Sequence, residues 1–223
     1  MNLKVALLAR ARSITQVVLA FAPGDRFDPA VRATTSRPGH RGWLAGVLGV
    51  LLVLGGLASH GQTVLIDFGA GATPTLLGPA PNDPAHHWNN LLIEVGALDT
   101  GVLTNLVTTL NMPTSIGLMM VSRFSGFNES GTTVSTLYPP NATRDSFFGH
   151  TELFGGLSNI FPSFKLTGLG LDTVYSFTFY ASRTGVADVR ETGYTVTGGN
   201  AGFAALDAAN NIDNFATVAG IMP

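Results

Sequence analysis

Two arginines in the last third of the chain are the first residues whose type and spacing suggest chemistry. Arg183 and Arg190 lie in "ASRTGVADVRETGYTVTG" (181–198), and they are two of the five basic residues that follow position 41. If the alternating patterns of the segments on either side continue, both side chains point toward the interior. A buried guanidinium has to be paired, because an isolated buried charge is strongly unfavourable.

Two roles for these arginines are open. The first is structural: Asp188 and Glu191 are close in sequence, and an ion pair between Arg183 or Arg190 and one of these carboxylates would hold a hairpin together. The second is binding, because a planar guanidinium in a cleft suits a carboxylate or the hydroxyls of a sugar. We favour the structural role and keep both arginines as candidate ligand-binding residues.

A second candidate binding site is the segment "HHWNN" (86–90). Trp88 could stack on a sugar ring while Asn89 and Asn90 bond its hydroxyls. Neighbouring residues of a strand face opposite ways, so the adjacent histidines would chelate one ion poorly. The alternative is that Trp88 belongs to the core and the asparagines lie at a turn or a sheet edge.

The segment "DAANNID" (207–213) supplies oxygen ligands of the kind that calcium prefers. Asp207, Asn210 and Asp213 are the candidates, although their spacing is not that of an EF-hand and Asn-Asn is common in turns. We therefore expect no cofactor, with calcium as the alternative. No Gly-x-Ser-x-Gly, His-Glu-x-x-His or P-loop motif is present, so we expect a protein that is not an enzyme.

Charge is distributed unevenly and indicates an exported protein. Residues 1–41 contain seven basic and two acidic residues, whereas the rest contains five basic and twelve acidic residues. Residues 42–59 are uncharged, and this segment ends in the small-residue stretch "GLASHGQ" (56–62). This order is typical of a signal peptide, and we expect cleavage before Gln62, with the bond after Ala58 as the alternative position. The alternative is a retained membrane anchor formed by residues 42–59.

These features divide the chain into three parts. Residues 1–41 form a basic extension whose start we expect to be mis-assigned, and 42–61 form a signal helix with its cleavage site. Residues 62–223 form one domain, which is too acidic to attract nucleic acid. The leader, if uncleaved, is the only part expected to contact a membrane.

The domain is expected to be all-β. Short alternating segments separated by Gly, Pro, Asn and Asp recur along it, and no long segment has the 3.6-residue apolar repeat of a helix. This pattern is typical of an antiparallel β-sandwich, with a parallel sheet disfavoured and one short helix within 139–148. Strands are expected at 63–68, 88–95, 102–110, 115–124, 163–169, 173–182, 190–198, 202–208 and 214–220.

Several motifs together resemble a β-sandwich module of exported bacterial proteins, many of which carry a sorting anchor of the PEP-CTERM type. The motifs are "VLIDFG", "WNN", "ATRDSFF", "YSFTFYASR", "RETGYTVTG" and "LDAANNIDNFATVAGI". The module is similar to galactose-binding-like and fibronectin type III-like jelly rolls. Its members usually continue into further strands and an anchor, so the resemblance implies a C-terminally truncated domain here.

The sequence therefore predicts a secreted or cell-surface, non-catalytic β-sandwich with a binding or structural role. Its expected partners are polysaccharide or other envelope components. One alternative is a structural envelope or matrix protein without a small ligand. The other is a fragment of a larger secreted hydrolase.

Overall fold

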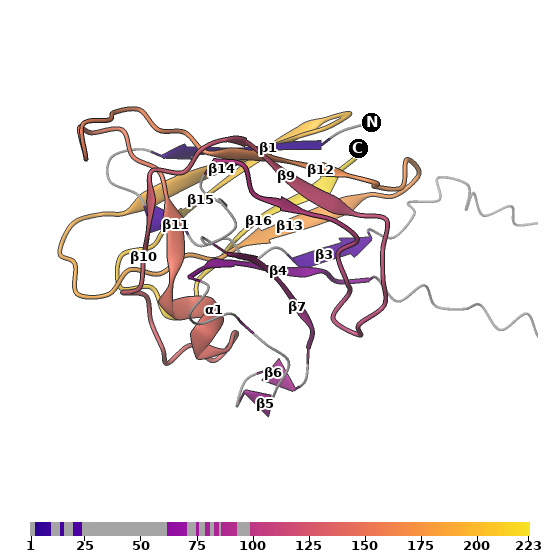
Figure 1. Cartoon of the computed structure of the whole chain (residues 1–223), viewed down its shortest axis with the longest axis horizontal. Coiled ribbons are helices and arrows are strands. Elements are labelled where there is room, and N and C mark those ends of the chain that lie inside the picture. The colour runs from indigo at the N-terminus through magenta and orange to yellow at the C-terminus, as the bar shows by residue number, and fades with distance from the viewer. Residues whose placement is uncertain are drawn as a thin grey trace, which may run out of the picture. The chain divides into compact units, whose positions relative to one another are not determined.

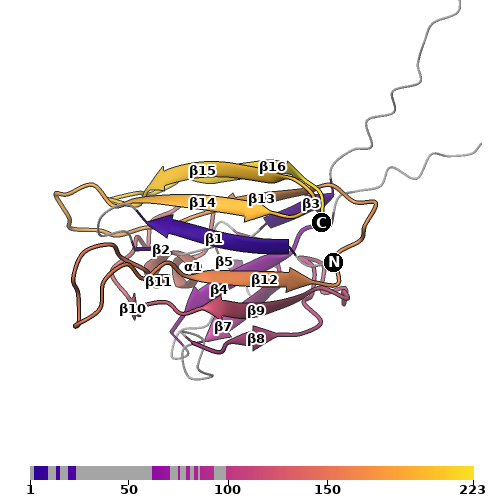
Figure 2. The ribbon, with the colours of Figure 1, turned by 90° about the horizontal axis from the view of Figure 1, so that it is seen from above.

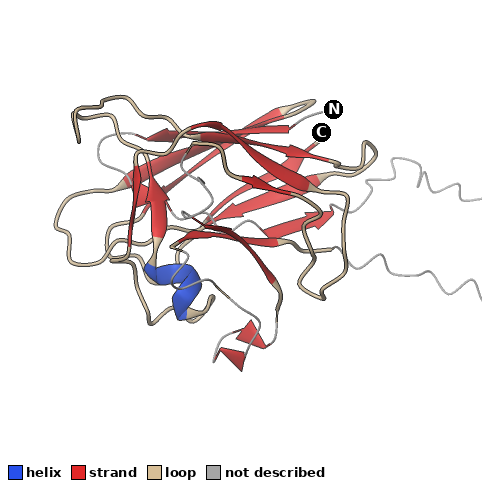
Figure 3. Cartoon of the chain, viewed as in Figure 1, coloured by secondary structure: helices blue, strands red, loops and turns tan. Residues whose placement is uncertain are grey.

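The structure is a computed structural model, and it describes residues 3–9, 14–15, 20–23, 62–70, 75, 79–80, 83–84, 86–92 and 99–223. These residues form almost entirely strands, with one short helix, α1 (Pro140–Arg144), as Figure 3 shows. The prediction of an all-β fold built from antiparallel sheets is thereby confirmed. The predicted signal segment 42–61 lies outside the described residues.

One layer is a six-stranded sheet, seen along the top of Figure 1 and face-on in Figure 2. All of its neighbouring strands are antiparallel. Its order is β15 (Ala201–Asp207), β14 (Glu191–Thr197), β1 (Leu3–Ala9), β12 (Ser163–Thr167), β9 (Gly117–Ser122) and β8 (Val102–Leu103).

The second layer lies beneath the first and contains two groups of strands (Figure 2). The first group has the order β16 (Ala216–Ile221), β13 (Tyr175–Phe179) and β3 (Ala20–Pro23). The second group pairs β4 (Leu65–Gly69) with β7 (Trp88–Leu92) in parallel. The sequence predicted antiparallel pairing alone, and this parallel pair is an exception. A parallel pair needs a long crossover connection, and the 18 residues between the two strands are long enough to provide one.

Small sheets complete the described part. At one end of the sandwich β10 (Gly126–Asn128) pairs with β11 (Ser146–Phe148), which also pairs with β2 (Ile14–Thr15). A separate ladder joins β5 (Pro79–Ala80) to β6 (Asp83–Pro84). The end formed by β10 and β11 also lines a cavity of about 420 Å³.

The core lies between the two layers and is rich in aromatic rings. In β13 buried residues alternate with half-buried ones, as the period-two pattern predicts. Phe179 of β13 stacks on Tyr194 of β14, with ring centroids 4.3 Å apart and planes 10° apart. Both side chains are fully buried, so this pair joins the two layers.

The sandwich includes strands from before position 62. The described strands β1, β2 and β3 pair with β12 and β14, with β11 and with β13, respectively. The division of the chain at Gln62 stays a prediction. Among the residues that the structure describes, no helix has the length and apolar character needed to cross a membrane.

Candidate functional site

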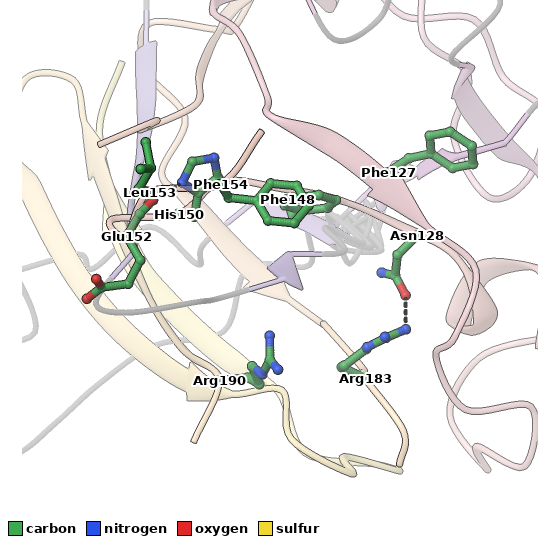
Figure 4. Close-up of a pocket in the computed structure, with 10 residues that line it drawn as sticks. Phe127, Asn128, Phe148, His150, Glu152, Leu153, Phe154, Arg183 and Arg190 are labelled. Carbon is green, nitrogen blue, oxygen red and sulfur yellow. Dashed lines mark hydrogen bonds between the residues drawn. The ribbon is translucent and has the colours of Figure 1, made fainter. Parts of the chain in front are cut away.

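A cavity of about 420 Å³ opens where the ends of several strands meet, and it contains both predicted arginines. It lies between the β10–β11 sheet, the loop that follows β11, and the segment that joins β13 to β14. Its lining residues are Phe127, Asn128, Phe148, Gly149, His150, Glu152, Leu153, Phe154, Arg183 and Arg190. Figure 4 shows the two guanidinium groups on one side and the rings of Phe148 and Phe154 on the other.

The two arginines are held together by the backbone of one buried residue. Arg183 donates its backbone N–H to the carbonyl of Ala208 at 2.8 Å, and Ala208 donates its own N–H to the carbonyl of Arg190 at 3.2 Å. Ala208 is fully buried. These bonds bring the motifs "ASR", "RET" and "LDAANN" together in space. The sequence alone did not predict this contact, because the motifs are separated along the chain.

Arg183 contacts a neutral partner rather than a carboxylate. Its Nη1 donates to Oδ1 of Asn128 at 2.8 Å, as the dashed line in Figure 4 marks. Its Nε is buried without a hydrogen-bond partner, and no carboxylate of the described residues lies within ion-pair distance of it. Arg183 is thus a half-buried cation that the described part of the protein does not neutralise.

Arg190 has a carboxylate neighbour. Its Nη2 lies 3.0 Å from Oδ1 of Asp188, and its side chain is 18% exposed. Its backbone N–H donates to Oδ1 of Asp207 at 2.8 Å. Arg190 and Asp188 thus form an ion pair, whereas the other candidate carboxylate, that of Glu191, is exposed and lies opposite Asp207 in the β14–β15 ladder.

Aromatic rings form the opposite wall of the cavity. Phe154, which is 58% exposed, lies edge-on to Phe148 with centroids 5.7 Å apart and edge-on to His150 at 5.6 Å. His150 is buried and holds the loop in place. Its Nδ1 donates to the carbonyl of Glu152 at 2.6 Å, and its Nε2 lies 2.7 Å from Oγ of Ser125.

This cavity can bind a small molecule that carries both a negative charge and an apolar face. Guanidinium groups provide donors for a carboxylate or hydroxyls, and the rings of Phe148, Phe154 and the partly exposed Phe127 provide flat apolar surface. A volume of about 420 Å³ falls within the range of small-molecule sites. Because Nδ1 of His150 donates to a carbonyl, its Nε2 is left to accept a hydrogen bond from the hydroxyl of Ser125.

The structure places Trp88 elsewhere, in a small buried cluster with Leu65, Ala142 and Tyr180. Trp88 is 8% exposed and lies edge-on to Tyr138, with centroids 6.0 Å apart. A second cavity of about 310 Å³ adjoins it. Burial raises the pKa of the phenols of Tyr138 and Tyr180, so both remain neutral.

The two asparagines of the "WNN" motif bind the protein itself. Asn89 donates to the carbonyls of Leu65 and Val107 and accepts from the N–H of Val107, each at 2.9 Å. Asn90 exchanges two hydrogen bonds with the backbone of Thr75, at 2.8 and 2.9 Å. Their amide groups hold neighbouring segments, and the structure does not bring them to the cavity that contains the arginines.

The three calcium candidates have separate partners. Asp207 accepts from the backbone of Arg190 and Ala209. Asn210 bonds to Gly185 and Val186, whereas Asp213 accepts hydrogen bonds from Ser135 and Thr136. These last bonds hold the pKa of Asp213 below its ordinary value. Among the described residues no cluster of three or more His, Cys, Asp or Glu could hold a metal ion.

Sequence reasoning missed a pair of buried carboxyl groups, Asp67 and Asp145. Both are buried, at 1% and 0% exposure, and Asp67 Oδ2 accepts from Oγ1 of Thr75 at 2.7 Å. Burial and then the nearby charge of Asp145 raise the pKa of Asp67 to about 8. Asp145 accepts from the N–H of Ala70 at 2.8 Å. The signal available in the sequence was one aspartate within the apolar segment "VLIDFG" and another shortly before the two phenylalanines of "RDSFF".

Comparisons with known proteins leave the family open. No family model, no curated protein and no solved structure matches this chain. The geometry of the cavity is therefore the basis for a functional proposal.

Proposed function

We propose that this chain is an exported, non-catalytic binding module of the cell surface or the extracellular space, and that its ligand is an acidic saccharide. The observation that carries the proposal is the position of Arg183 and Arg190 opposite a wall of aromatic rings in one cavity. The resemblance to exported β-sandwich modules and the leader-like segment 42–61 support the location.

The charge of Arg183 supports an anionic group in the ligand. This guanidinium is half-buried and contacts the neutral Asn128. A half-buried cation attracts a carboxylate more strongly than an exposed one does, because water screens it less. A carboxylate in the cavity would place a negative charge against the guanidinium of Arg183.

The opposite wall supports a ring with apolar C–H groups. Phe154 and Leu153 are 58% and 76% exposed at the mouth of the cavity. Large exposed apolar side chains beside polar groups are typical of binding sites. A uronic acid combines both requirements, since its carboxylate would face the arginines and its ring would cover a phenyl face.

Binding should be measured by calorimetry with two matched oligosaccharides, an oligogalacturonate and its uncharged methyl ester. We expect the acid form to bind at least about tenfold more tightly, because one charge-assisted hydrogen bond contributes about 1.5–3 kcal/mol. Arg183→Gln should abolish most of this preference. Phe154→Ala should weaken both ligands, since it removes ring contact without removing charge.

Two controls make the test specific. Arg123→Gln removes an exposed arginine that contacts the carbonyl of Phe124 at 3.1 Å and Asp99 at 3.3 Å and does not line the cavity, so binding should not change. Trp88→Ala tests the second cavity that adjoins Trp88. Equal affinity for the acid and the ester, or binding that Arg183→Gln leaves unchanged while Trp88→Ala removes it, would contradict the proposal.

A further inference from the structure

We propose that the space between β12 and β14 is a strand-accepting slot, that Leu3–Ala9 is its occupant in this chain, and that the same peptide binds there without a covalent link. The slot is separate from the cavity that contains the arginines. In the six-stranded sheet, β1 lies between β14 and β12 and pairs with both.

The directions of the strands show why the slot needs a separate occupant. Because β12 and β14 are each antiparallel to β1, they run parallel to each other, as the arrows in Figure 2 show. They are separated by two strand spacings, about 10 Å. Without β1, both would present unpaired N–H and C=O groups, and direct pairing between them would require a parallel ladder in a new register.

The register shows which kind of peptide fits. Val5 lies opposite Phe164 on one side and Val196 on the other, and both of these partners are fully buried. Leu7 lies opposite the buried Tyr194. The positions of Leu3, Val5 and Leu7 therefore share the face of the sheet that carries the core, so the slot selects an extended segment with apolar residues at every second position.

One position of the occupant is poorly matched. Lys4 lies directly opposite Lys165 in the register, and like charges directly opposite each other are destabilising. An acidic residue at this position would improve the pairing.

Cleavage of the proposed leader would remove the strand that fills the slot. The described strands β1, β2 and β3 pair with strands that follow Gln62, and the expected cleavage position lies between these two groups of strands in the sequence. Cleavage before Gln62 would separate β1 from the sandwich. An exported, processed chain would then carry an open slot for a strand of the same pattern.

The slot can be tested in the full chain. A protease recognition sequence is inserted within 25–60, the folded protein is cut, and the two pieces are run on a sizing column under native conditions. We expect the N-terminal piece to elute with the rest. A fluorescent synthetic peptide of residues 1–24, added in excess, should then exchange into the complex, as followed by anisotropy.

Two peptide variants and one control establish the register without affecting the folding of the protein. Val5→Asp should lower the affinity of the peptide for the slot at least tenfold, because it places a charged residue opposite the buried Phe164 and Val196. Ala6→Asp should bind within about twofold, since Ala6 lies on the other face. Lys4→Glu should bind roughly two- to fivefold more tightly. Release of the N-terminal piece on cutting, or equal loss for Val5→Asp and Ala6→Asp, would overturn the proposal.

Discussion

Asp67 shows how one buried carboxyl can make stability depend on pH. Its pKa is raised from 3.8 to about 8, first by burial and then by the charge of Asp145. The folded state therefore holds a proton that the unfolded state loses above about pH 4. The stabilising contribution is complete below pH 4 and is lost as the pH rises toward 8.

We therefore expect Asp67→Asn to flatten the stability profile. In the parent chain this group alone lowers the free energy of unfolding by about 3 kcal/mol between pH 5 and pH 7, at about 1.4 kcal/mol per pH unit. The amide is nearly the same size and can still accept the hydrogen bond from Thr75. Urea unfolding of both proteins at several pH values measures the difference, and parallel profiles would contradict the raised pKa.

Asn89 is a structural residue at a position where the sequence alone suggested sugar binding. Its side chain makes three hydrogen bonds of 2.9 Å to the backbone of Leu65 and Val107. Asn89→Ala leaves these groups without partners and should cost about 2–4 kcal/mol of unfolding free energy.

The matched control for this prediction is Asn200→Ala. Asn200 is exposed and makes two bonds, to Gly220 and Met222. Asn200→Ala should lower the free energy of unfolding by less than about 1 kcal/mol, because water replaces the lost hydrogen-bond partners. Thermal unfolding of both variants is the measurement, and equal losses would show that Asn89 does not hold these segments.

At the scale of elements, most strands could be predicted because alternation and turn residues are local signals. The segments expected at 173–182 and 190–198 contain β13 and β14, and the segment expected at 202–208 overlaps β15. The short helix expected within 139–148 is α1. Which arginine meets which partner could not be predicted, because it depends on long-range contacts such as those of Ala208 and Asn128.

Alternation failed where a segment is covered on both sides. All five residues of β4 are buried: Ile66 and Phe68 belong to the main core, whereas Leu65 belongs to the cluster around Trp88. After β13 the residues Tyr180, Ala181 and Ser182 are also all buried. The direction of Arg183 consequently could not be obtained by extending the pattern of β13.

The turn that ends β12 offers a test of backbone geometry. Gly168 has a φ of +71°, and a Cβ there would lie 1.9 Å from the carbonyl oxygen of Ser115. Gly185 has a similar φ of +69° but open space around it. Both glycines adopt a conformation that other residues rarely adopt, and only Gly168 adds a collision.

We expect Gly168→Ala to cost about 3 kcal/mol or more, and Gly185→Ala about 1–2 kcal/mol. The difference between the two variants isolates the contact between the β12 turn and Ser115. Denaturant unfolding measures both. Equal costs would mean that the turn moves away from Ser115 freely and does not fix the end of the sheet.

At the scale of the whole molecule, the distribution of charge limits the kind of ligand that can approach the cavity. Beyond position 41 the chain carries twelve acidic and five basic residues, so the arginines of the cavity form a local exception in an acidic body. Such a body repels long polyanions, including nucleic acids. This favours a ligand that presents one or a few carboxylates at the cavity.

The proposed export makes a prediction about the whole chain. In a Gram-negative host we expect the exported product to begin at Gln62, because Ser59 and Gly61 place small residues at the third-last and last positions before the cut. Gly61→Tyr puts a bulky side chain at the last of these positions and should cause the uncut precursor to accumulate. N-terminal sequencing and intact-mass measurement of the secreted and membrane fractions distinguish the products.

The same measurement determines which strand arrangement the exported protein has. A product that begins at Gln62 lacks Leu3–Ala9, so its six-stranded sheet has lost the strand between β12 and β14. Gly61→Tyr should retain this strand, and the precursor should therefore bind the labelled peptide of residues 1–24 at least tenfold more weakly than the processed product does. Recovery of the parent chain from the cytoplasm with its first residues intact would contradict export and would leave β1 as a permanent part of the sheet.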